Sequence, residues 1–434
     1  MCGPQSVPWL AILDIVFYIY VGIKPSALID HLPMQRQEML LNLCKGRRNR
    51  DFRLLLSEAK YCICSDPRDK IFALLSLVRP NEKGIKIEPD YTKSVYEVYQ
   101  DVMVQFITVG NLQLLSTIEM HEHLEGVPSW VPDWTSPRLS KRLRIYNAAA
   151  QFETMAEFWQ HGILQVAGVL VGVIEDAEAF NISSNIYRSE ASNILELQRV
   201  VAHIGLQDMD LLSNSALHEL CQALFGNDVS ERYRPFRPSS RTLANTERFL
   251  IDALNFRLDL ESLKCHLTRE NDRILLFLIV YCQERCLFKS LNGRLGRGPK
   301  AARAGDIITV VLGLSCPLIL RPTNDNKFRV VGEAYYNSVM DGEALLGPLP
   351  DGIERVFYQS PNTAYFNRNN NTVTIVDPRL GDMPPDWKIE SDPQDEGFQW
   401  FVNKETGEER WQDPRFTLDL LKKRGIQLQV FDLV

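Results

Sequence analysis

The side chains most able to do chemistry are few and scattered in this 434-residue chain. His121 and His123 stand together in "EMHEHLEG" without the further ligands that a metal site needs. Nine cysteines are spread thinly, and no zinc quartet emerges from the two close pairs, Cys62 with Cys64 and Cys282 with Cys286. We interpret the cysteines as buried thiols in a reducing compartment, and we expect no catalytic residues, no metal and no cofactor.

Two further stretches carry groups that bind ions in other proteins. The glycine-rich "NGRLGRG" (Asn292–Gly298) lacks the lysine–hydroxyl pair of a phosphate-binding loop, although the basic side chains around it could hold an anion. "MDGE" (Met340–Glu343) has two acids and a turn glycine but not the ligand spacing of a calcium loop. We interpret the first as a solvated loop and the second as a tight turn, and we expect a protein that is not an enzyme.

Aromatic side chains, by contrast, follow a clear pattern in "MPPDWKIESDPQDEGFQWFVNKETGEERWQDPR" (Met383–Arg415). The stretch has a proline pair before a first tryptophan, a central aromatic pair followed by Asn403, then a second tryptophan and a closing proline. In this order it resembles a WW module, which implies a small three-stranded antiparallel sheet with "KETG" as a turn. The two outer tryptophans are 24 positions apart, slightly more than is usual for that module.

The two faces of such a sheet would have different tasks, because alternation along a strand puts Trp400 on one face and Phe401 on the other. One face is expected to form a small core, made by Trp387, Phe401, Asn403 and Pro414. On the opposite face two tryptophans stand side by side, an arrangement that grips a polyproline II peptide. The candidate peptide-binding residues are Trp400, Trp411, Lys404 and Glu409.

The acidic charge of this stretch limits the kinds of peptide that it can bind. Ten acidic and four basic residues between Asp382 and Arg415 give it a net charge of −6, against −7 for the whole chain. A phosphorylated ligand is disfavoured because phosphate needs cationic partners, whereas a neutral or basic proline-rich segment fits. Alternatively the aromatic face clamps the chain's own body, where "GPLP" (Gly347–Pro350) and "VPSWVP" (Val127–Pro132) are internal candidates.

Composition places the protein among ordinary globular proteins, with 45% hydrophobic and 24% charged residues. The body outside the acidic stretch is nearly neutral, so we expect no nucleic-acid partner. Near the N-terminus the longest uncharged apolar run, Ile15–Ile23, is nine residues, well short of the roughly 20 that span a bilayer. We therefore expect a buried helix there, no membrane span and a cytoplasmic protein.

Periodicity predicts the α+β class: a mainly helical body, a small antiparallel β subdomain and the three-stranded WW-like module near the C-terminus. In "SDPRDKIFALLSLV" (Ser65–Val78) Asp66 and Pro67 are suited to start a helix. In "PDYTKSVYEVYQDVMVQFI" (Pro89–Ile107) Ser94 and Glu97 can form a capping box. The expected regions are 1–137 (helical), 138–290 (mixed), 291–380 (antiparallel β), 381–416 (WW-like) and 417–434 (tail).

Short motifs in a fixed order resemble the fungal heterokaryon incompatibility (HET) family over nearly the whole length. They include "CGPQSVPW", "SDPRDKIFALLSL", "PDYTKSVYEVYQD", "VPSWVPDW", "GDIITVVLGLSCPLILRP", "VVGEAYYNSVMDGEAL" and "LLKKRGIQLQVFDLV". The resemblance implies a role in self/non-self recognition that leads to incompatibility or cell death after hyphal fusion. We expect a non-enzymatic scaffold or regulatory protein of this type; the alternative is an adaptor that binds proline-rich peptides through its WW-like module.

Members of that family usually begin with a HET module that carries blocks such as Y-x-x-L-S-Y-x-W-G and W-I-D-x-x-C-I-N-Q. Neither block occurs in this sequence, and "CGPQSVPW" resembles the segment that comes after the module. We therefore expect a family member without its signature module, through either a true truncation or a misplaced gene start.

Overall fold

The computed structural model describes most of the chain after the first fifty residues: 52–58, 62–78, 85–120, 127–136, 140–143, 146–159, 162–182, 190–206, 214–226, 243–254, 274, 278–357, 363–392 and 395–434. Two compact units result, one from residues 1–109 with 131–138 and the other from residues 110–130 with 139–434. The stretch "CGPQSVPW", the apolar run Ile15–Ile23 and the His121/His123 pair lie outside the described residues. Within the described part, no helix is both long and apolar enough to cross a membrane.

The first unit is built around helix α5 (Val95–Thr108). The predicted capping box is confirmed: the Ser94 hydroxyl accepts from the Glu97 amide at 3.3 Å, and the Glu97 carboxylate accepts from the Ser94 amide at 2.7 Å. These bonds also hold the pKa of Glu97 below its ordinary value. The buried face of α5 packs Phe106 against Phe52, with ring centroids 6.1 Å apart. The other described elements of this unit are α3 (Phe52–Glu58), α4 (Asp69–Phe72) and the 3-10 turn η3 (Leu75–Leu77).

The helix expected over Ser65–Val78 is thus only the single turn α4 followed by η3. The reason lies in Asp66, whose carboxylate accepts from the backbone and the guanidinium of Arg68 instead of capping a helix. Arg68 takes the N-cap position without a side-chain cap. The tryptophans of "VPSWVPDW" are buried, Trp130 in the second unit and Trp134 in the first.

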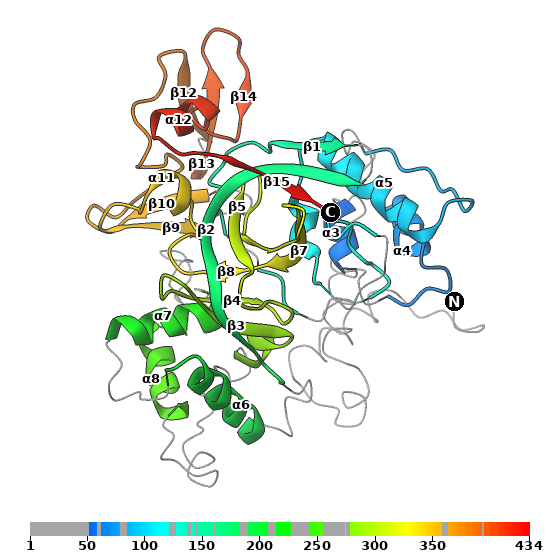
Figure 1. The fold of residues 1–434 in the computed structure, drawn as a ribbon. Coiled ribbons are helices and arrows are strands. Elements are labelled where there is room, and N and C mark those ends of the chain that lie inside the picture. Colours follow the sequence, from blue (N-terminus) through cyan, green and yellow to red (C-terminus); the bar gives the residue numbers. More distant parts are fainter. Residues whose placement is uncertain are drawn as a thin grey trace, which may run out of the picture. The chain divides into compact units, whose positions relative to one another are not determined.

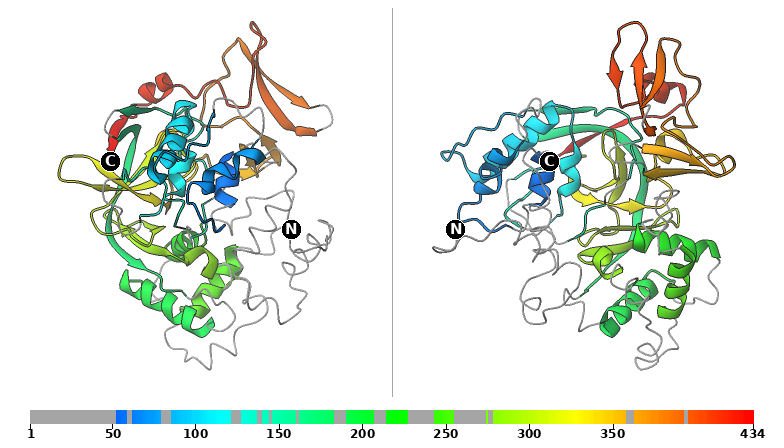
Figure 2. Two further views of the ribbon diagram at one scale, coloured as in Figure 1. Left: turned by 90° about the vertical axis from the view of Figure 1, so that its right-hand side faces the viewer. Right: turned by 180° about the vertical axis from the view of Figure 1, so that it is seen from behind.

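A closed five-stranded β-barrel forms the centre of the second unit (Figures 1 and 2). Its strands follow the order β2, β5, β6, β7 and β15, and β15 returns to pair with β2. Their bounds are β2 (Ile163–Ala179), β5 (Ile307–Val311), β6 (Leu318–Pro322), β7 (Phe328–Glu333) and β15 (Gln429–Leu433). β15 is antiparallel to β2 and parallel to β7, so the last strand in the sequence closes the barrel.

Strand β2 belongs to two sheets in succession. Its first part pairs with β1 (Ala156–Trp159), β5 and β15, and its last part pairs with β3 (Arg285–Ser290). The register shifts near Leu170 and near Ile174, where bulges let a long strand bend. Gly168 lies where the neighbouring strand comes very close, since a Cβ there would meet the Val310 carbonyl oxygen at 2.5 Å. The sheet continues from β3 through β4 (Leu295–Pro299) to β8 (Tyr335–Tyr336).

The expected mainly helical body is therefore wrong, because the body is centred on a barrel. Barrel closure joins β2 to β15, which are separated by about 250 residues in the sequence, and periodicity within short windows carries no information about such pairing. The strands β4 and β5 are buried almost throughout, so they lack the polar alternation that marks an exposed strand. "NGRLGRG", expected as a solvated loop, forms part of the β3–β4 hairpin, and its Arg297 is buried.

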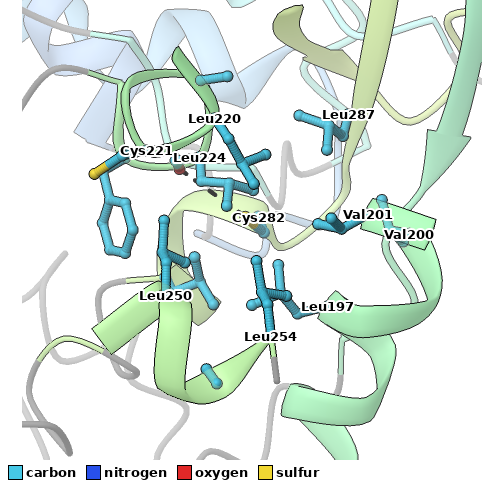
Figure 3. Close-up of a cluster of buried hydrophobic side chains, with 14 of the residues drawn as sticks. Leu197, Val200, Val201, Leu220, Cys221, Leu224, Leu250, Leu254, Cys282 and Leu287 are labelled. Carbon is cyan, nitrogen blue, oxygen red and sulfur yellow. Dashed lines mark hydrogen bonds between the residues drawn. The ribbon is translucent and has the colours of Figure 1, made fainter. Parts of the chain in front are cut away.

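A helical cluster packs on the β3–β4 side of this unit. Its helices are α6 (Glu190–His203), α7 (Asn214–Phe225) and α8 (Leu243–Ala253). Figure 3 shows leucines and valines from these helices converging with Cys221, Cys282 and Leu287 in one apolar core. Burial raises the pKa of the Cys282 and Cys286 thiols to about 12, so both remain protonated and unreactive at neutral pH.

The remaining described elements are η4 (Gln113–Thr117), which precedes the barrel in the sequence, and the elements between β8 and the last barrel strand, β15. The latter are α11 (Glu343–Leu346), β9 (Ile353–Phe357), β10 (Thr363–Asn367), β11 (Thr372–Thr374), β12 (Trp387–Asp392), β13 (Asp395–Asn403), β14 (Glu409–Arg410) and α12 (Leu418–Lys423). β9, β10 and β11 form one three-stranded sheet, and β12, β13 and β14 form another. The second of these contains the aromatic pattern singled out in the sequence.

Candidate functional site

The sheet of β12, β13 and β14, drawn in orange to red in Figure 1, is antiparallel throughout. The turn between β13 and β14 is organised by Asn403, whose side-chain oxygen accepts from the amides of Glu405 at 2.9 Å and Thr406 at 3.0 Å. Gly407 follows with φ of +70°, a conformation that favours glycine. We call residues 387–411 the aromatic module.

One face of the aromatic module forms its own small core. Trp387 and Phe401 are buried there and pack with Ile375 and Met383. The Arg410 guanidinium lies over the Trp387 ring, 5.4 Å from its centroid. Asn403 contributes by donating to the Asp386 carboxylate at 3.2 Å, which ties the turn to the segment before β12.

The opposite face carries the two other tryptophans side by side. The rings of Trp400 and Trp411 have centroids 6.1 Å apart and planes inclined by 57°. Trp411 is 56% exposed and Trp400 is half-buried. At this separation the two rings contact each other and form one aromatic surface, and the exposed ring of Trp411 lets an apolar ring of a ligand pack against it.

The charged candidates separate into two kinds. Lys404 is held on the segment before β12, since its ammonium donates to the Pro385 carbonyl at 2.7 Å and its amide donates to the Asp386 carbonyl at 2.6 Å. Glu409 is exposed on β14, opposite Val402. Lys404 therefore stabilises the turn, and Glu409 is the charged candidate that borders the tryptophan face.

Both ends of the aromatic module are fixed by the same tripeptide, Asp-Pro-Arg. Before the module the Asp377 carboxylate accepts from the amide of Arg379 at 3.0 Å and from its guanidinium at 2.9 and 2.7 Å. After the module Asp413 and Arg415 make the same three bonds at 3.0, 2.9 and 2.6 Å. Both aspartates are buried, so each corner is a forked ion pair shielded from water. Pro414, expected in the aromatic core, is the half-buried centre of the second corner.

The first corner joins a wider buried polar network. Burial alone would raise the pKa of Asp377, but bonds from Arg379 and from the Tyr365 hydroxyl, at 2.6 Å, hold it below its ordinary value. Arg379 also donates to the carbonyls of Gly347 and Asp341, at 2.8 and 2.9 Å. The segment "MDGE" thus forms a turn within this network, with Gly342 at φ of +85°.

The second corner holds the exit of the module to the barrel. The Asp413 amide donates to the Gln151 side chain at 3.1 Å, and the Gln412 side chain donates to the Gln151 carbonyl. Phe416 meets Phe152 edge to face with centroids 5.2 Å apart. The guanidinium of Arg415 donates to the Gly381 carbonyl, which lies just before the module.

The sequence signal that points to these corners is the repetition of "DPR" at three places. At the third, Asp66 and Arg68 make the same bonds, but their side chains are 31% and 22% exposed against 1% and 3% for Asp377 and Arg379. The tripeptide is therefore a local corner, and its surroundings decide whether it also becomes a buried anchor.

In the described part of the chain, no group of three or more His, Cys, Asp or Glu residues could hold a metal ion. Arg285 and Glu333 form a fully buried ion pair at 2.9 Å. Glu333 also accepts from the Leu143 amide and Arg285 donates to the Lys141 carbonyl, so the pair fastens residues 141–143 to the barrel.

Comparison with known proteins finds one family model that matches part of the chain. A model of the Het-6 beta-barrel domain matches residues 255–347. That segment contributes β5, β6 and β7, whereas β2 and β15 lie outside the match. The chain is also similar to heterokaryon incompatibility protein 6, OR allele, of Neurospora crassa, with 22% identity over 343 aligned residues that cover 64% of this chain and 49% of the relative. The alignment spans about half the length of that protein. Both findings support a relationship to the heterokaryon incompatibility family.

Proposed function

We propose that this relative of heterokaryon incompatibility proteins acts in fungal non-self recognition as a non-enzymatic scaffold in the cytoplasm. In this proposal the barrel supports the aromatic module, and the module binds a proline-rich segment of a partner protein. The similarity of the barrel segment and of the longer alignment supports the incompatibility role. The resemblance of the module to WW modules supports the type of partner.

The single observation that carries the binding role is the position of Trp411. Its ring stands beside that of Trp400 with 56% of its surface exposed. Large aromatic side chains are usually buried, and an exposed ring such as that of Trp411, beside a second ring, favours a surface for a partner. The alternative that the tryptophans clamp the chain's own body is weaker, because Trp130 of the internal candidate "VPSWVP" is fully buried and donates to the Gly162 carbonyl at 2.8 Å.

The contacts that fix the aromatic module to the rest of the chain also favour ligand binding. Its core residues Trp387 and Phe401 pack on the face away from the tryptophan pair, and both ends of the module are fixed by buried ion pairs. A rigid aromatic surface loses little conformational entropy when a ligand binds. A polyproline II segment is similarly preorganised, so the two surfaces are matched in this respect.

Peptide binding to the full chain tests the proposal. A fluorescently labelled proline-rich peptide should bind, and Trp411→Ala should weaken binding at least about tenfold, the effect expected of a central aromatic contact. Trp159→Ala is the matched control, because Trp159 is 53% exposed on β1, and it should leave binding unchanged. Equal affinities for Trp411→Ala and the unchanged chain would refute the binding role.

Thermal melting of the same variants distinguishes ligand binding by the tryptophan pair from an intramolecular clamp. Both side chains are more than half exposed, so a binding role predicts similar melting temperatures for both alanine variants. A clamp predicts that Trp411→Ala alone lowers the melting temperature of the body.

The second candidate function, an adaptor independent of incompatibility, is favoured by the same tryptophan pair with its exposed Trp411. Expression in fused hyphae of a filamentous fungus separates the two. The scaffold proposal expects growth arrest after fusion that is lost with Trp411→Ala, whereas the adaptor expects partner binding with no effect on growth.

A further inference from the structure

We infer that the tryptophan face selects proline-rich segments that carry an arginine or lysine, and that Glu409 makes this selection. This inference rests on the proposed function, because it names the chemical class of the ligand for the same site. It concerns the charge of the partner, which the similarity to known proteins does not address.

The strand register places Glu409 on the ligand side of the sheet. Val402 of β13 lies opposite Glu409 of β14, and Trp400 lies two residues before Val402 on the same strand. Residues two apart on a strand point to the same face, and residues opposite each other across an antiparallel pair share a face. Glu409 therefore stands on the face of Trp400, one row along the sheet from the tryptophan pair.

Among the residues whose side chains the structure describes, two other acids on or near this face are paired with bases of the protein. Glu390, opposite Trp400, is paired with Lys388 at 2.5 Å. Glu408 is paired with Arg410 at 2.6 Å, and Lys404 donates to the Pro385 carbonyl. Among the described residues Glu409 takes part in no ion pair. Its exposed carboxylate is thus a charge on this face that a ligand can meet.

Distances along the two partners agree with a direct contact. Successive rows of one face lie about 6.6–7 Å apart along a strand. A polyproline II segment rises about 3.1 Å per residue, so a residue two or three positions from the proline held by the tryptophans reaches the row of Glu409. The forked guanidinium of arginine matches a carboxylate in this position, and lysine matches it as a point charge.

The net charge of the residues around Glu409 also favours a basic ligand. The stretch from Asp382 to Arg415 carries a net charge of −6, which attracts a basic segment and repels an acidic or phosphorylated one. An exposed ion pair contributes modestly, so arginine at the matched position should tighten binding roughly two- to fivefold over glutamine. This difference in affinity is small but measurable, and it should decrease as the salt concentration is raised.

Three peptides of the form PPPPR, PPPPQ and PPPPE test the inference on the full chain. We expect the arginine peptide to bind most tightly and the glutamate peptide most weakly. Glu409→Gln should remove the preference for arginine while leaving the affinity for the glutamine peptide nearly unchanged. Glu405→Gln is the matched control, because Glu405 is exposed in the turn and the substitution changes the net charge equally.

Two results would overturn the selection by Glu409. One is equal affinity for the three peptides; the other is an equal loss of preference in Glu405→Gln and Glu409→Gln, which would assign the effect to net charge. Failure of the proposed function looks different: no proline peptide binds, or binding of all three survives Trp411→Ala, and the inference then falls with it.

Discussion

Arg415 donates a guanidinium hydrogen bond to the carbonyl oxygen of Gly381, so the residues that enter and leave the aromatic module are held against each other. Arg415 is itself fixed by Asp413, and the segment before Gly381 is fixed by the corresponding pair of Asp377 and Arg379. The module is therefore a unit inserted between two adjacent anchors, with the β9–β11 sheet before it and α12 and the barrel strand β15 after it.

Excising the module should accordingly leave the barrel folded. A chain in which residues 382–412 are replaced by a short glycine–serine linker should keep one cooperative thermal transition, because its ends already meet at Gly381 and Arg415. Circular dichroism at increasing temperature measures this. The contrasting variant lacks only residues 429–434, and it should lose the cooperative transition because β15 closes the barrel. Collapse of the excision variant with survival of the shorter deletion would contradict the described architecture.

The three Asp-Pro-Arg corners offer a test of burial with sequence held constant. Asp377→Ala leaves the Arg379 guanidinium buried without its carboxylate and should lower the free energy of unfolding by about 3–5 kcal/mol. Asp66→Ala removes the same bonds from an exposed corner and should change stability little. Urea titrations of the two variants measure the difference. Equal effects would show that local geometry, and not burial, sets the strength of the corner.

Glu343 should make stability depend on pH in the direction opposite to Asp377. Burial, and then the charge of Asp341, raise the pKa of Glu343, so the folded state binds a proton more tightly than the unfolded chain does. The stabilisation from that proton is complete below the unfolded pKa of about 4.3 and is lost as pH rises through the folded pKa. Glu343→Gln should therefore be more stable than the unchanged chain at pH 7, with an advantage that shrinks as pH falls.

Urea titrations at several pH values check this prediction, with Glu405→Gln as an exposed control. The variant keeps an oxygen that can accept from the Asp341 amide, as Glu343 does at 2.6 Å. A loss of stability that is constant across pH would show that Glu343 is needed as a carboxylate in the network.

Local elements could be predicted from the sequence because their residues lie close together in the chain. The barrel could not, because its strands pair across a long sequence separation. Ser94 and Glu97 lie three positions apart, so their capping box can be seen in one helical turn. The alternation of Trp400 and Phe401 likewise predicts two faces within one strand, and the structure places Phe401 in the core and Trp400 opposite it. The pairing of β15 with β2 joins residues such as Gln429 and Gly168, which are 261 positions apart, and no local pattern reports it.

At Asp66 the sequence predicts a helix cap, whereas the structure shows bonds to Arg68. An aspartate before a proline favours a helix start, yet the arginine after that proline offers its amide and its guanidinium, and the carboxylate binds both. The same competition fixes Asp377 and Asp413. A tripeptide that occurs three times was visible in the sequence, but its burial at two of the three places depends on contacts made only in the folded chain.

Whether the tryptophan pair binds proline-rich segments can be measured by the indole N–H resonances of the seven tryptophans. On titration of the full chain with a proline-rich peptide, we expect the resonances of Trp400 and Trp411 to shift in a saturable manner while that of Trp159 stays in place. Shifts confined to other tryptophans, or the absence of any shift at peptide concentrations up to about 1 mM, would contradict binding by this pair.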